Sequence, residues 1–429
     1  MIGFIKLKKL GKNPFAELPR EVAILSTVSF LVAVGFGLII PAIPIFAASF
    51  GVSKTAIGLI ISAFAIVRFA SGLVSGKLVD KFGERTVLGF GLFMVSFFTL
   101  LTALSQNYSQ LLIFRSLGGL GSSMFSVSAG SLLMRSVSDD YRARAQSLYN
   151  GGFLLGGISG PAVGGLLAGI SLRAPFFVYS ITLAMAAITA LFFLSEKKLG
   201  KKVDAPTTQI GQTTLSQAFR LRPYQIALVL AFINNWVLFG LRSSILPLFV
   251  TEKLNSTATI AGIGLTIGAL IQGIFMLKAG KYSDVKGRKA ALLFGGAFIL
   301  FGILMLAFTT NIFWYLISMA LFGLGSAYVG TAPGSVVGDI IKGRGGQVIA
   351  AWQMAGDAGM IVGPILVGLL TDYFSYQAAF LFSGFIWIIA LVLSATLPET
   401  RASHLENDLI PEKINRSCDR SQLLYRSIF

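Results

Sequence analysis

Charge, histidine and cysteine are all scarce in this chain of 429 residues. Only 12% of the residues are charged, whereas a soluble globular protein has about 25%. The one histidine, His404, and the one cysteine, Cys418, both lie near the C-terminus. An intramolecular disulfide, a Cys/His metal site and a histidine proton relay in the apolar part of the chain are therefore excluded. No G-x-x-x-x-G-K-[ST] phosphate loop is present, and we expect neither a metal nor a cofactor.

Apolar residues, in contrast, are abundant. They make up 55% of the chain, and its mean hydropathy is +0.78. Windows of about 20 apolar residues, enough to cross a bilayer, recur twelve times without β-barrel alternation, so we predict an all-α membrane protein. The predicted spans lie near 23–46, 55–76, 86–105, 109–134, 145–169, 175–194, 224–250, 257–278, 290–309, 312–334, 347–370 and 377–397.

The net charge of +17 could indicate a nucleic-acid partner, but the positions of the basic residues explain it, and we expect no nucleic acid as a partner. Lys and Arg concentrate in both tails and in every second loop, whereas the opposite loops hold only Lys54, Arg173 and Lys253. By the positive-inside rule both tails are cytoplasmic, as an even number of spans requires. We expect a multi-pass protein of the cell membrane whose first apolar stretch is retained, with the N-terminal KLKKLGK run anchored at the lipid surface.

The longest polar gap divides the spans six and six. It runs from Glu196 to Arg222 and has the composition of a linker. The predicted organisation is a cytoplasmic N-terminal tail at 1–22, a six-helix half at 23–194, a cytoplasmic linker at 195–223, a second six-helix half at 224–397 and a cytoplasmic C-terminal tail at 398–429.

Two motifs recur on either side of this linker. GKLVDKFGER at 76–85 and GKYSDVKGRK at 280–289 both fit G-x-x-x-D-x-x-G, and GPAVGG at 160–165 corresponds to GPILVG at 363–368. Nearly the same spacing separates both pairs, which indicates an internal duplication. Parallel six-helix repeats with a substrate site between them are a known transporter plan.

These motifs resemble those of the major facilitator superfamily, and the resemblance covers all twelve spans. Four residues match the family's loop signature and recur in the second half, namely Gly76, Asp80, Gly83 and Arg85, then Gly280, Asp284, Gly287 and Arg288. Glu84 departs from the signature, in which a basic residue is usual. Arg115 and Gly119 match the fourth-helix signature in part, because Gly118 stands where a polar residue is common.

A second signature is more specific. Gly156, Gly160, Pro161, Gly164 and Gly165 fit in full the fifth-helix pattern of the family's drug:proton antiporters. A first-helix pattern of the same group is present as Gly37, Leu38, Pro41 and Pro44. The resemblance therefore implies a twelve-helix exporter.

The glycines of the fifth span and Pro161 suit close helix packing in lipid and a bend. By resemblance this element, with Gly363 and Pro364 as its echo, acts as a seal or hinge in alternating access. A tightly packed kink without such a role is the alternative. In the loop signature, Asp80 is suited to a helix N-terminus of the other half, with Arg85 pairing across the same gap. The alternative is a solvated turn in which Gly83 supplies the positive φ.

Proton coupling needs a group that changes charge within the membrane. Asp357 is the acidic residue that lies well inside a predicted span, and such residues tend to mark pathways. Arg68 lies roughly 13 Å and Asp357 roughly 15 Å from the cytoplasmic ends of their helices at 1.5 Å per residue. Because these helices pack together in the family, we predict an Arg68–Asp357 pair that protonation weakens. A fixed ion pair that never titrates is the alternative.

Two further arginines lie within spans. By resemblance Arg115 takes part in proton transfer or substrate contact, although a structural cation bonded to backbone carbonyls is an equal alternative. We expect Arg242 to extend to the membrane surface. Asp339, at the end of the tenth span, is expected to be solvated.

The substrate cavity can be outlined by aligning the GP motifs of the two halves. Each half then offers an aromatic residue beside an amide on corresponding helices, and these, with further amides, would form an apolar pocket with a few polar anchors. The predicted residues are Tyr149, Asn150, Asn234, Asn235, Gln272, Trp352 and Gln353. The aromatic residues have the alternative of facing lipid or a neighbouring helix.

The sequence therefore favours a monomeric, non-enzymatic secondary transporter that exports small, largely apolar compounds in exchange for protons. A proton-coupled porter or facilitator for sugars or organic anions is the alternative. A membrane enzyme or a sensor without transport is a more remote one.

Overall fold

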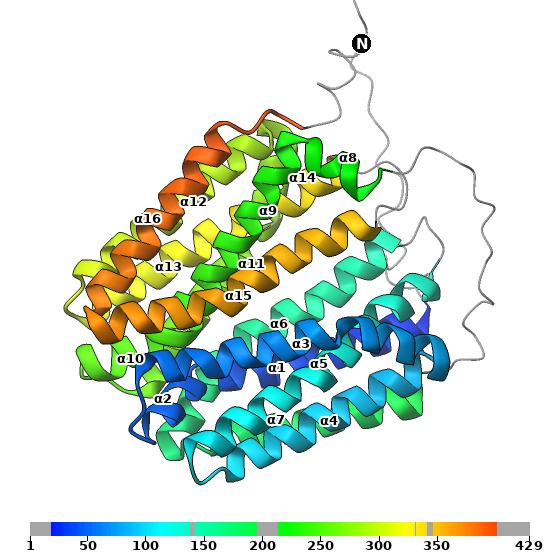
Figure 1. Cartoon of the computed structure of the whole chain (residues 1–429), viewed down its shortest axis with the longest axis horizontal. Helices are drawn as coiled ribbons and strands as arrows, with labels where there is room; N and C mark the ends of the chain where they lie inside the picture. Colours follow the sequence, from blue (N-terminus) through cyan, green and yellow to red (C-terminus); the bar gives the residue numbers. More distant parts are fainter. Residues whose placement is uncertain (1–18, 138–141, 195–212, 331, 341–345, 401–429) are drawn as a thin grey trace, which may run out of the picture. The chain divides into compact units, whose positions relative to one another are not determined.

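The computed structural model describes residues 19–137, 142–194, 213–330, 332–340 and 346–400. Most of both predicted tails and of the linker lies outside these ranges. The regular elements within them are all helices, and twelve helical segments are long and apolar enough to cross a membrane. The prediction of an all-α membrane protein with twelve spans is thereby confirmed (Figure 1).

The described residues form two compact units. The first holds the described residues up to 194 together with Asn255–Thr266, and the second holds the others. The first six spans make up most of the first unit, with bounds α1 (Arg20–Ile39), α2 (Ala42–Ala48), α3 (Lys54–Phe82), α4 (Glu84–Leu104), α5 (Tyr108–Ser136), α6 (Arg142–Ile170) and α7 (Ala174–Phe193). Pro41 lies between α1 and α2, which together form one span.

The second unit contains the other six spans, apart from the beginning of α11. Its elements are α8 (Leu215–Arg220), α9 (Arg222–Asn235), η3 (Trp236–Ile245), α10 (Leu246–Leu248), η4 (Phe249–Lys253), α11 (Ala258–Lys286), α12 (Arg288–Phe308), α13 (Ile312–Val329), α14 (Ala332–Ile340), α15 (Gly346–Tyr373) and α16 (Tyr376–Ala395).

Side-chain caps define where several spans begin. Ser53, Asn107, Asn311 and Ser375 each accept a hydrogen bond from a backbone N–H in the first turn of the following helix, which satisfies a donor that has no partner within the helix. Asn107 and Asn311 occupy corresponding positions of the two repeats. The duplication is therefore visible in the caps as well as in the motifs.

The seventh span is not the regular α-helix that its apolar sequence predicts. It is π-helical over η3 and η4, with the short α10 between them. Pro247 in α10 has no backbone N–H to donate, so the regular ladder cannot continue through it. Ser243 Oγ donates to Leu238 O, five residues earlier, at 2.9 Å. Single-turn π-bulges often mark functional sites.

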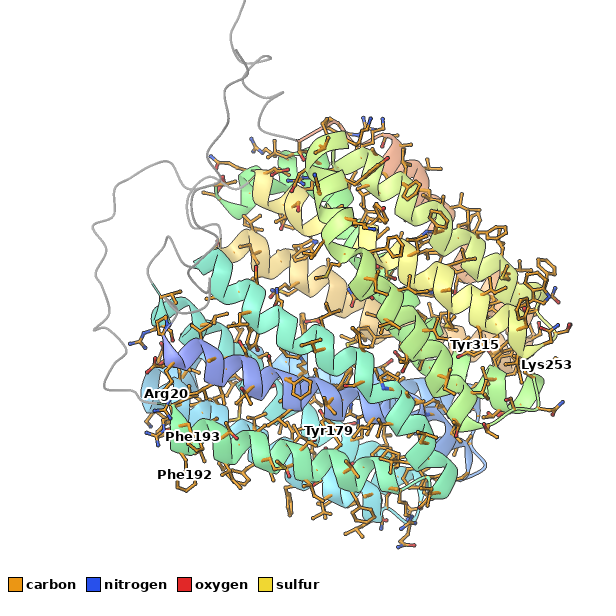
Figure 2. The ribbon with its side chains drawn as sticks, turned by 180° about the vertical axis from the view of Figure 1, so that it is seen from behind. Arg20, Tyr179, Phe192, Phe193, Lys253 and Tyr315 are labelled. Carbon is orange, nitrogen blue, oxygen red and sulfur yellow. The ribbon has the colours of Figure 1, made fainter. Side chains whose placement is uncertain are left out.

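Within the first unit α1 packs against α6 and α7, and α4 packs against α5 and α7 (Figure 1). Buried hydroxyls join α4 to α7, since Ser96 Oγ donates to Ser180 O at 2.8 Å and Ser180 Oγ to Ser96 O at 2.9 Å. Figure 2 shows Arg20 beside Phe193, where the guanidinium carbon lies 5.9 Å from the ring centroid. Polar links of this kind hold helices together in lipid, where the hydrophobic effect between helices is absent.

Within the second unit α12 packs against α13 and α16, and α15 packs against α9 and η3. Trp387 Nε1 donates to Gly296 O at 2.8 Å, and Trp236 Nε1 donates to Ser383 Oγ at 3.2 Å. Tyr224 Oη donates to Val348 O at 2.7 Å, which ties the start of α9 to α15. These three aromatic residues therefore bury their rings and still find a partner for their polar atoms.

Candidate functional site

The glycines of the fifth-span signature bring α6 into backbone contact with α1. A Cβ at Gly156 would lie 2.6 Å from Val34 N, and one at Gly160 would lie 2.6 Å from Val34 O. A Cβ at Gly164 would overlap the Leu38 carbonyl. These three positions lie on one helical face, and no larger side chain fits there without moving the helices apart.

Gly165 lies on a second face of α6, against the beginning of α11. A Cβ there would lie 2.7 Å from Ala258 O and 3.2 Å from Gly262 Cα, and Thr259 Oγ1 donates to Gly165 O at 3.2 Å. These α11 residues belong to the first unit. The signature therefore supplies α6 with two smooth faces, and α6 is continuous through Pro161.

The second unit repeats the close glycine contact that α6 makes with α1. Gly363 of α15 meets the backbone of Trp236 and Gly240, since a Cβ at Gly240 would lie 2.7 Å from Gly363 C. In the first unit a Cβ at Gly37 would lie 2.8 Å from Gly160 Cα. The spacing between GPAVGG and GPILVG also relates Gly37 to Gly240. The duplicated motif is thus a duplicated helix contact, and α15 is continuous through Pro364.

The loop signature of the first unit forms a turn between α3 and α4. Gly83 ends α3 with φ 82°, in the region that favours glycine. Asp80 is exposed. Arg85 donates to Leu191 O of α7 in its own unit, and its pairing across the gap between the halves stays a prediction. Gly76 has open space around its Cβ position.

Glu84, the residue that departs from the family signature, forms an ion pair with Arg135 of α5. The side chain of Glu84 is 7% exposed and that of Arg135 is 37% exposed. Ser131 Oγ adds a hydrogen bond to the same carboxylate at 3.0 Å. The pair joins the start of α4 to the end of α5.

The corresponding loop of the second unit holds the same pair with its charges exchanged. Arg288 Nε donates to Asp339 Oδ2 at 3.2 Å, and Arg288 Nη1 contacts Asp284 Oδ1 at 2.5 Å. Gly287 has φ 101°, and Gly280 has open space around its Cβ position. The shift that aligns the two loop signatures places Arg288 on Glu84 and Asp339 on Arg135. The expectation of a solvated Asp339 was wrong, because this pair leaves its side chain 21% exposed.

Arg115 is buried in the first unit, and no described residue forms a hydrogen bond with its Nε. It is 6% exposed, and its guanidinium carbon lies 4.0 Å from the centroid of the Phe64 ring. The face of the Phe64 ring is therefore one partner of the Arg115 guanidinium.

Arg68 and Asp357, the predicted coupling pair, belong to different units. Arg68 is half-buried on α3 beside Gly119, where a Cβ would lie 3.0 Å from Arg68 N. Asp357 is half-buried on α15. On the same helix Trp352 is half-buried with no partner for Nε1 among the described residues, whereas Gln353 is exposed. The pairing of Arg68 with Asp357 stays a prediction.

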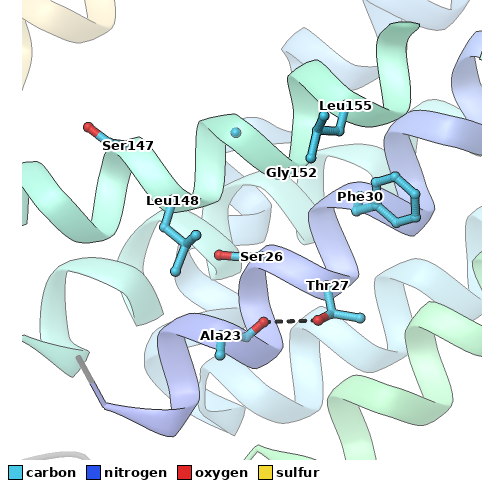
Figure 3. Close-up of a pocket in the computed structure, with 9 residues that line it drawn as sticks. Ala23, Ser26, Thr27, Phe30, Ser147, Leu148, Gly152 and Leu155 are labelled. Carbon is cyan, nitrogen blue, oxygen red and sulfur yellow. Dashed lines mark hydrogen bonds between the residues drawn. The ribbon is translucent and has the colours of Figure 1, made fainter. Parts of the chain in front are cut away.

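A pocket of about 540 Å³ opens between α1 and α6 (Figure 3). Its wall is mainly apolar. The polar side chains of α1 donate back to their own helix, Ser26 Oγ to Val22 O at 2.8 Å and Thr27 Oγ1 to Ala23 O at 3.0 Å. The lining residues are Ala23, Ser26, Thr27, Phe30, Ser147, Leu148, Gly151, Gly152 and Leu155.

The predicted cavity residues of α6 do not line this pocket, although their neighbours do. Tyr149 is buried against Phe153, with 5.3 Å between the ring centroids, and its backbone carbonyl accepts a hydrogen bond from Ser29 Oγ at 3.0 Å. Asn150 is exposed and accepts from Gln146 at 2.9 Å. The sequence did not predict this pocket, because the predicted cavity residues are polar or aromatic. The wall of the pocket between α1 and α6 consists mainly of small and aliphatic residues.

Two predicted cavity residues do meet in the second unit. Asn234 and Gln272 line a pocket of about 100 Å³ together with Arg242. Asn235 instead donates to Ala231 O of its own helix at 3.0 Å. The expectation that Arg242 extends to the membrane surface was wrong. Arg242 is 8% exposed, and its guanidinium carbon lies 5.6 Å from the centroid of the Phe322 ring.

Comparisons with known proteins agree with this architecture. The model of the Major Facilitator Superfamily matches residues 25–245 and 228–427. The chain is 26% identical over 401 residues to the class H tetracycline resistance protein of Pasteurella multocida, covering 90% of this chain and 96% of that one. It is 26% identical to multidrug resistance protein 2 of Bacillus subtilis, with 91% and 98% covered. Quinolone resistance protein NorA of Staphylococcus aureus is 25% identical, with 82% and 90% covered.

Solved structures show the same fold at low identity. A bacterial homologue of the human lysosomal transporter Spinster, inward-facing and unoccupied, has a TM-score of 0.72 at 15% identity, covering 90% of this chain and 98% of that chain. A mutant of the nucleoside transporter NupG has a TM-score of 0.68 at 14% identity, covering 88% of this chain and 99% of that chain.

Proposed function

The chain belongs to the major facilitator superfamily, and from that premise we propose that it exports small, largely apolar compounds in exchange for protons. It is a multi-pass membrane transporter rather than an enzyme. The tetracycline, multidrug and quinolone resistance proteins that it resembles over most of their length support this choice of cargo and direction. We further propose that it acts as a monomer in the cell membrane with both termini in the cytoplasm.

The observation that carries the choice of an apolar cargo is the wall of the pocket between α1 and α6. A pocket of about 540 Å³ falls within the roughly 300–1,000 Å³ of small-molecule sites. The hydroxyl protons of Ser26 and Thr27 are bound within α1, so these groups cannot donate to a polar cargo without breaking those bonds. Such a wall suits a compound that binds mainly by dispersion and desolvation.

We propose that Asp357, Arg68 and Arg115 carry the proton coupling. A proton moving down a potential of about 100 mV releases roughly 2.3 kcal/mol, which sustains roughly a 40-fold concentration ratio of a neutral cargo at 1.4 kcal/mol per tenfold. Arg115 is a buried cation without a carboxylate partner among the described residues, and protonation of Asp357 would change the charge balance of the membrane interior. This assignment rests on depth, burial and charge.

The glycine faces of α6 and the loop turns are proposed to serve alternating access. Side chains at Gly156, Gly160 and Gly164 would block the close approach of α6 to α1. The second face, at Gly165, meets α11 residues that follow the linker in sequence. Smooth faces let helices shift without side chains interlocking. The turns at Gly83 and Gly287, which have positive φ, would set the ends of the moving helices.

The test of this function fills the pocket while leaving helix packing intact. Gly151 and Gly157 both have open space at their Cβ positions, but only Gly151 is among the residues that line the pocket. In inside-out vesicles with an imposed proton gradient, we expect wild type and Gly157→Phe to accumulate a neutral lipophilic dye. Gly151→Phe should accumulate it at least tenfold more slowly. Equal accumulation by both variants would exclude this pocket as the cargo site, and no gradient-driven accumulation by wild type would refute the function.

A further inference from the structure

The pocket around Arg242 is small and is lined by both polar and apolar residues. The guanidinium is buried, its Nε has no hydrogen-bond partner among the residues that the structure describes, and none of the lining residues is acidic. Asn234, Gln272 and Ser326 contribute the other polar side chains. A Cβ at Gly268 would lie 3.2 Å from Arg242 Nη2, so this glycine leaves room for the guanidinium.

A buried cation without an anionic partner is costly unless something in the functioning molecule compensates its charge. Arg115 illustrates one solution within this chain, because its guanidinium carbon lies 4.0 Å from the Phe64 ring centroid. Arg242 has a longer contact of the same kind, at 5.6 Å from the Phe322 ring centroid, and it also borders the pocket. It also lies in the π-helical part of the seventh span, a departure from regular helix that often accompanies function.

The size and lining of the pocket indicate what it holds. A volume of about 100 Å³ is below the roughly 300 Å³ at which drug-sized sites begin, but it is several times the roughly 30 Å³ of one water molecule. It therefore fits a head group rather than a whole cargo. A planar carboxylate suits the fork of a guanidinium, with amide and hydroxyl donors beside it. Ile299 and Phe322 provide an apolar border for the adjoining carbon atoms.

We propose that this pocket binds the carboxylate of an amphipathic organic acid, so that the exporter accepts apolar compounds bearing a carboxylate as well as neutral ones. The proposal rests on the proposed function, whose cargo class it extends. Arg242 makes the charge-assisted contact, and Asn234, Gln272 and Ser326 complete the donor set.

The experiment measures equilibrium binding of radiolabelled 1-naphthaleneacetate and of its neutral amide to the purified protein in phosphatidylcholine nanodiscs. Wild type should prefer the acid. Arg242→Gln should weaken binding of the acid at least tenfold, the effect of losing a hydrogen bond between charged groups, and leave the amide unchanged. Arg242→Lys should retain part of the preference, because it keeps the charge but loses the fork. Arg222→Gln, which removes an exposed charge at the start of the same span, should bind like wild type.

Equal loss of acid and amide binding in Arg242→Gln, or no preference for the acid in wild type, would overturn the proposal. Arg242-dependent binding of radiolabelled chloride without binding of the acid would also overturn it, since the pocket would then hold an inorganic anion. If Arg242→Gln does not fold, Arg242→Lys takes its place, and an unchanged preference for the acid or an equal loss of acid and amide binding in that variant would overturn the proposal. Binding needs no proton gradient, so charge-selective binding without gradient-driven export would contradict only the proposed function.

Discussion

Exchanging the charges of Glu84 and Arg135 should preserve the stability of the first unit. The second unit already holds the exchanged arrangement at corresponding positions, Arg288 with Asp339. The double variant Glu84→Arg/Arg135→Asp copies that arrangement into the first unit. Each single variant instead places two like charges side by side at the junction of α4 and α5.

The exposure of the two side chains sets the expected magnitudes. Breaking a fully buried ion pair costs about 3–5 kcal/mol, whereas exposed pairs contribute about 0–1 kcal/mol. Glu84 is 7% exposed, but Arg135 is 37% exposed and can reach solvent. We therefore expect each single charge reversal to reduce the free energy of unfolding by about 2–3 kcal/mol. The double variant should lie within about 1 kcal/mol of wild type.

The assay is reversible unfolding of the purified protein in mixed SDS and dodecylmaltoside micelles, followed by tryptophan fluorescence. A double-mutant cycle isolates the pairwise contribution. A favourable coupling of several kcal/mol is expected, because each single variant contains a like-charge contact that the double variant lacks. Additive losses in the double variant would refute the idea that the two repeats share one ion-pair position with interchangeable charges.

Two other pairs of variants test residues of the sequence motifs. Gly83→Ala should reduce the free energy of unfolding by about 1–2 kcal/mol because Gly83 has φ 82°. Gly76 is helical and has open space at its Cβ position, so Gly76→Ala should be neutral or stabilising by up to about 1 kcal/mol. Equal effects of the two variants in the same micelle assay would contradict these roles. Asp357→Asn should abolish cargo-induced proton release from acid-loaded vesicles, measured with a pH-sensitive dye. Asp372 is exposed on the same helix, and Asp372→Asn should retain this proton release. Continued exchange by Asp357→Asn would exclude Asp357 as the coupling group.

The twelve spans and the duplication followed from the sequence because their physical causes are local. About 20 apolar residues are needed to cross a bilayer whatever the tertiary structure, and Gly83 and Gly287 set turns through their own backbone angles. The glycines of α6 were identified by motif, and their contact with α1 agrees with the small size that the motif requires. Such features depend on few partners.

The ion pairs and pockets depended on contacts that single-span reasoning does not supply. Asp339 was expected to be solvated because only its depth was considered, although the repeat spacing aligns it with Arg135 and would have revealed both pairs. Arg242 was placed at the surface because π-helical backbone cannot be inferred from its apolar neighbours. The pocket of Figure 3 was missed because its aliphatic lining has the same composition as a lipid-facing surface.

The most direct test of the central claim is gradient-driven accumulation by the purified protein alone. Proteoliposomes would carry the protein, an imposed pH difference of one unit and a neutral lipophilic cargo, with cargo and internal pH followed together. Proton-coupled export predicts accumulation that approaches about tenfold for one proton per cargo molecule, since one pH unit is worth about 1.4 kcal/mol, together with dissipation of the pH difference that depends on cargo. Equilibration of the cargo to equal concentrations with the pH difference unaffected would contradict proton-coupled export.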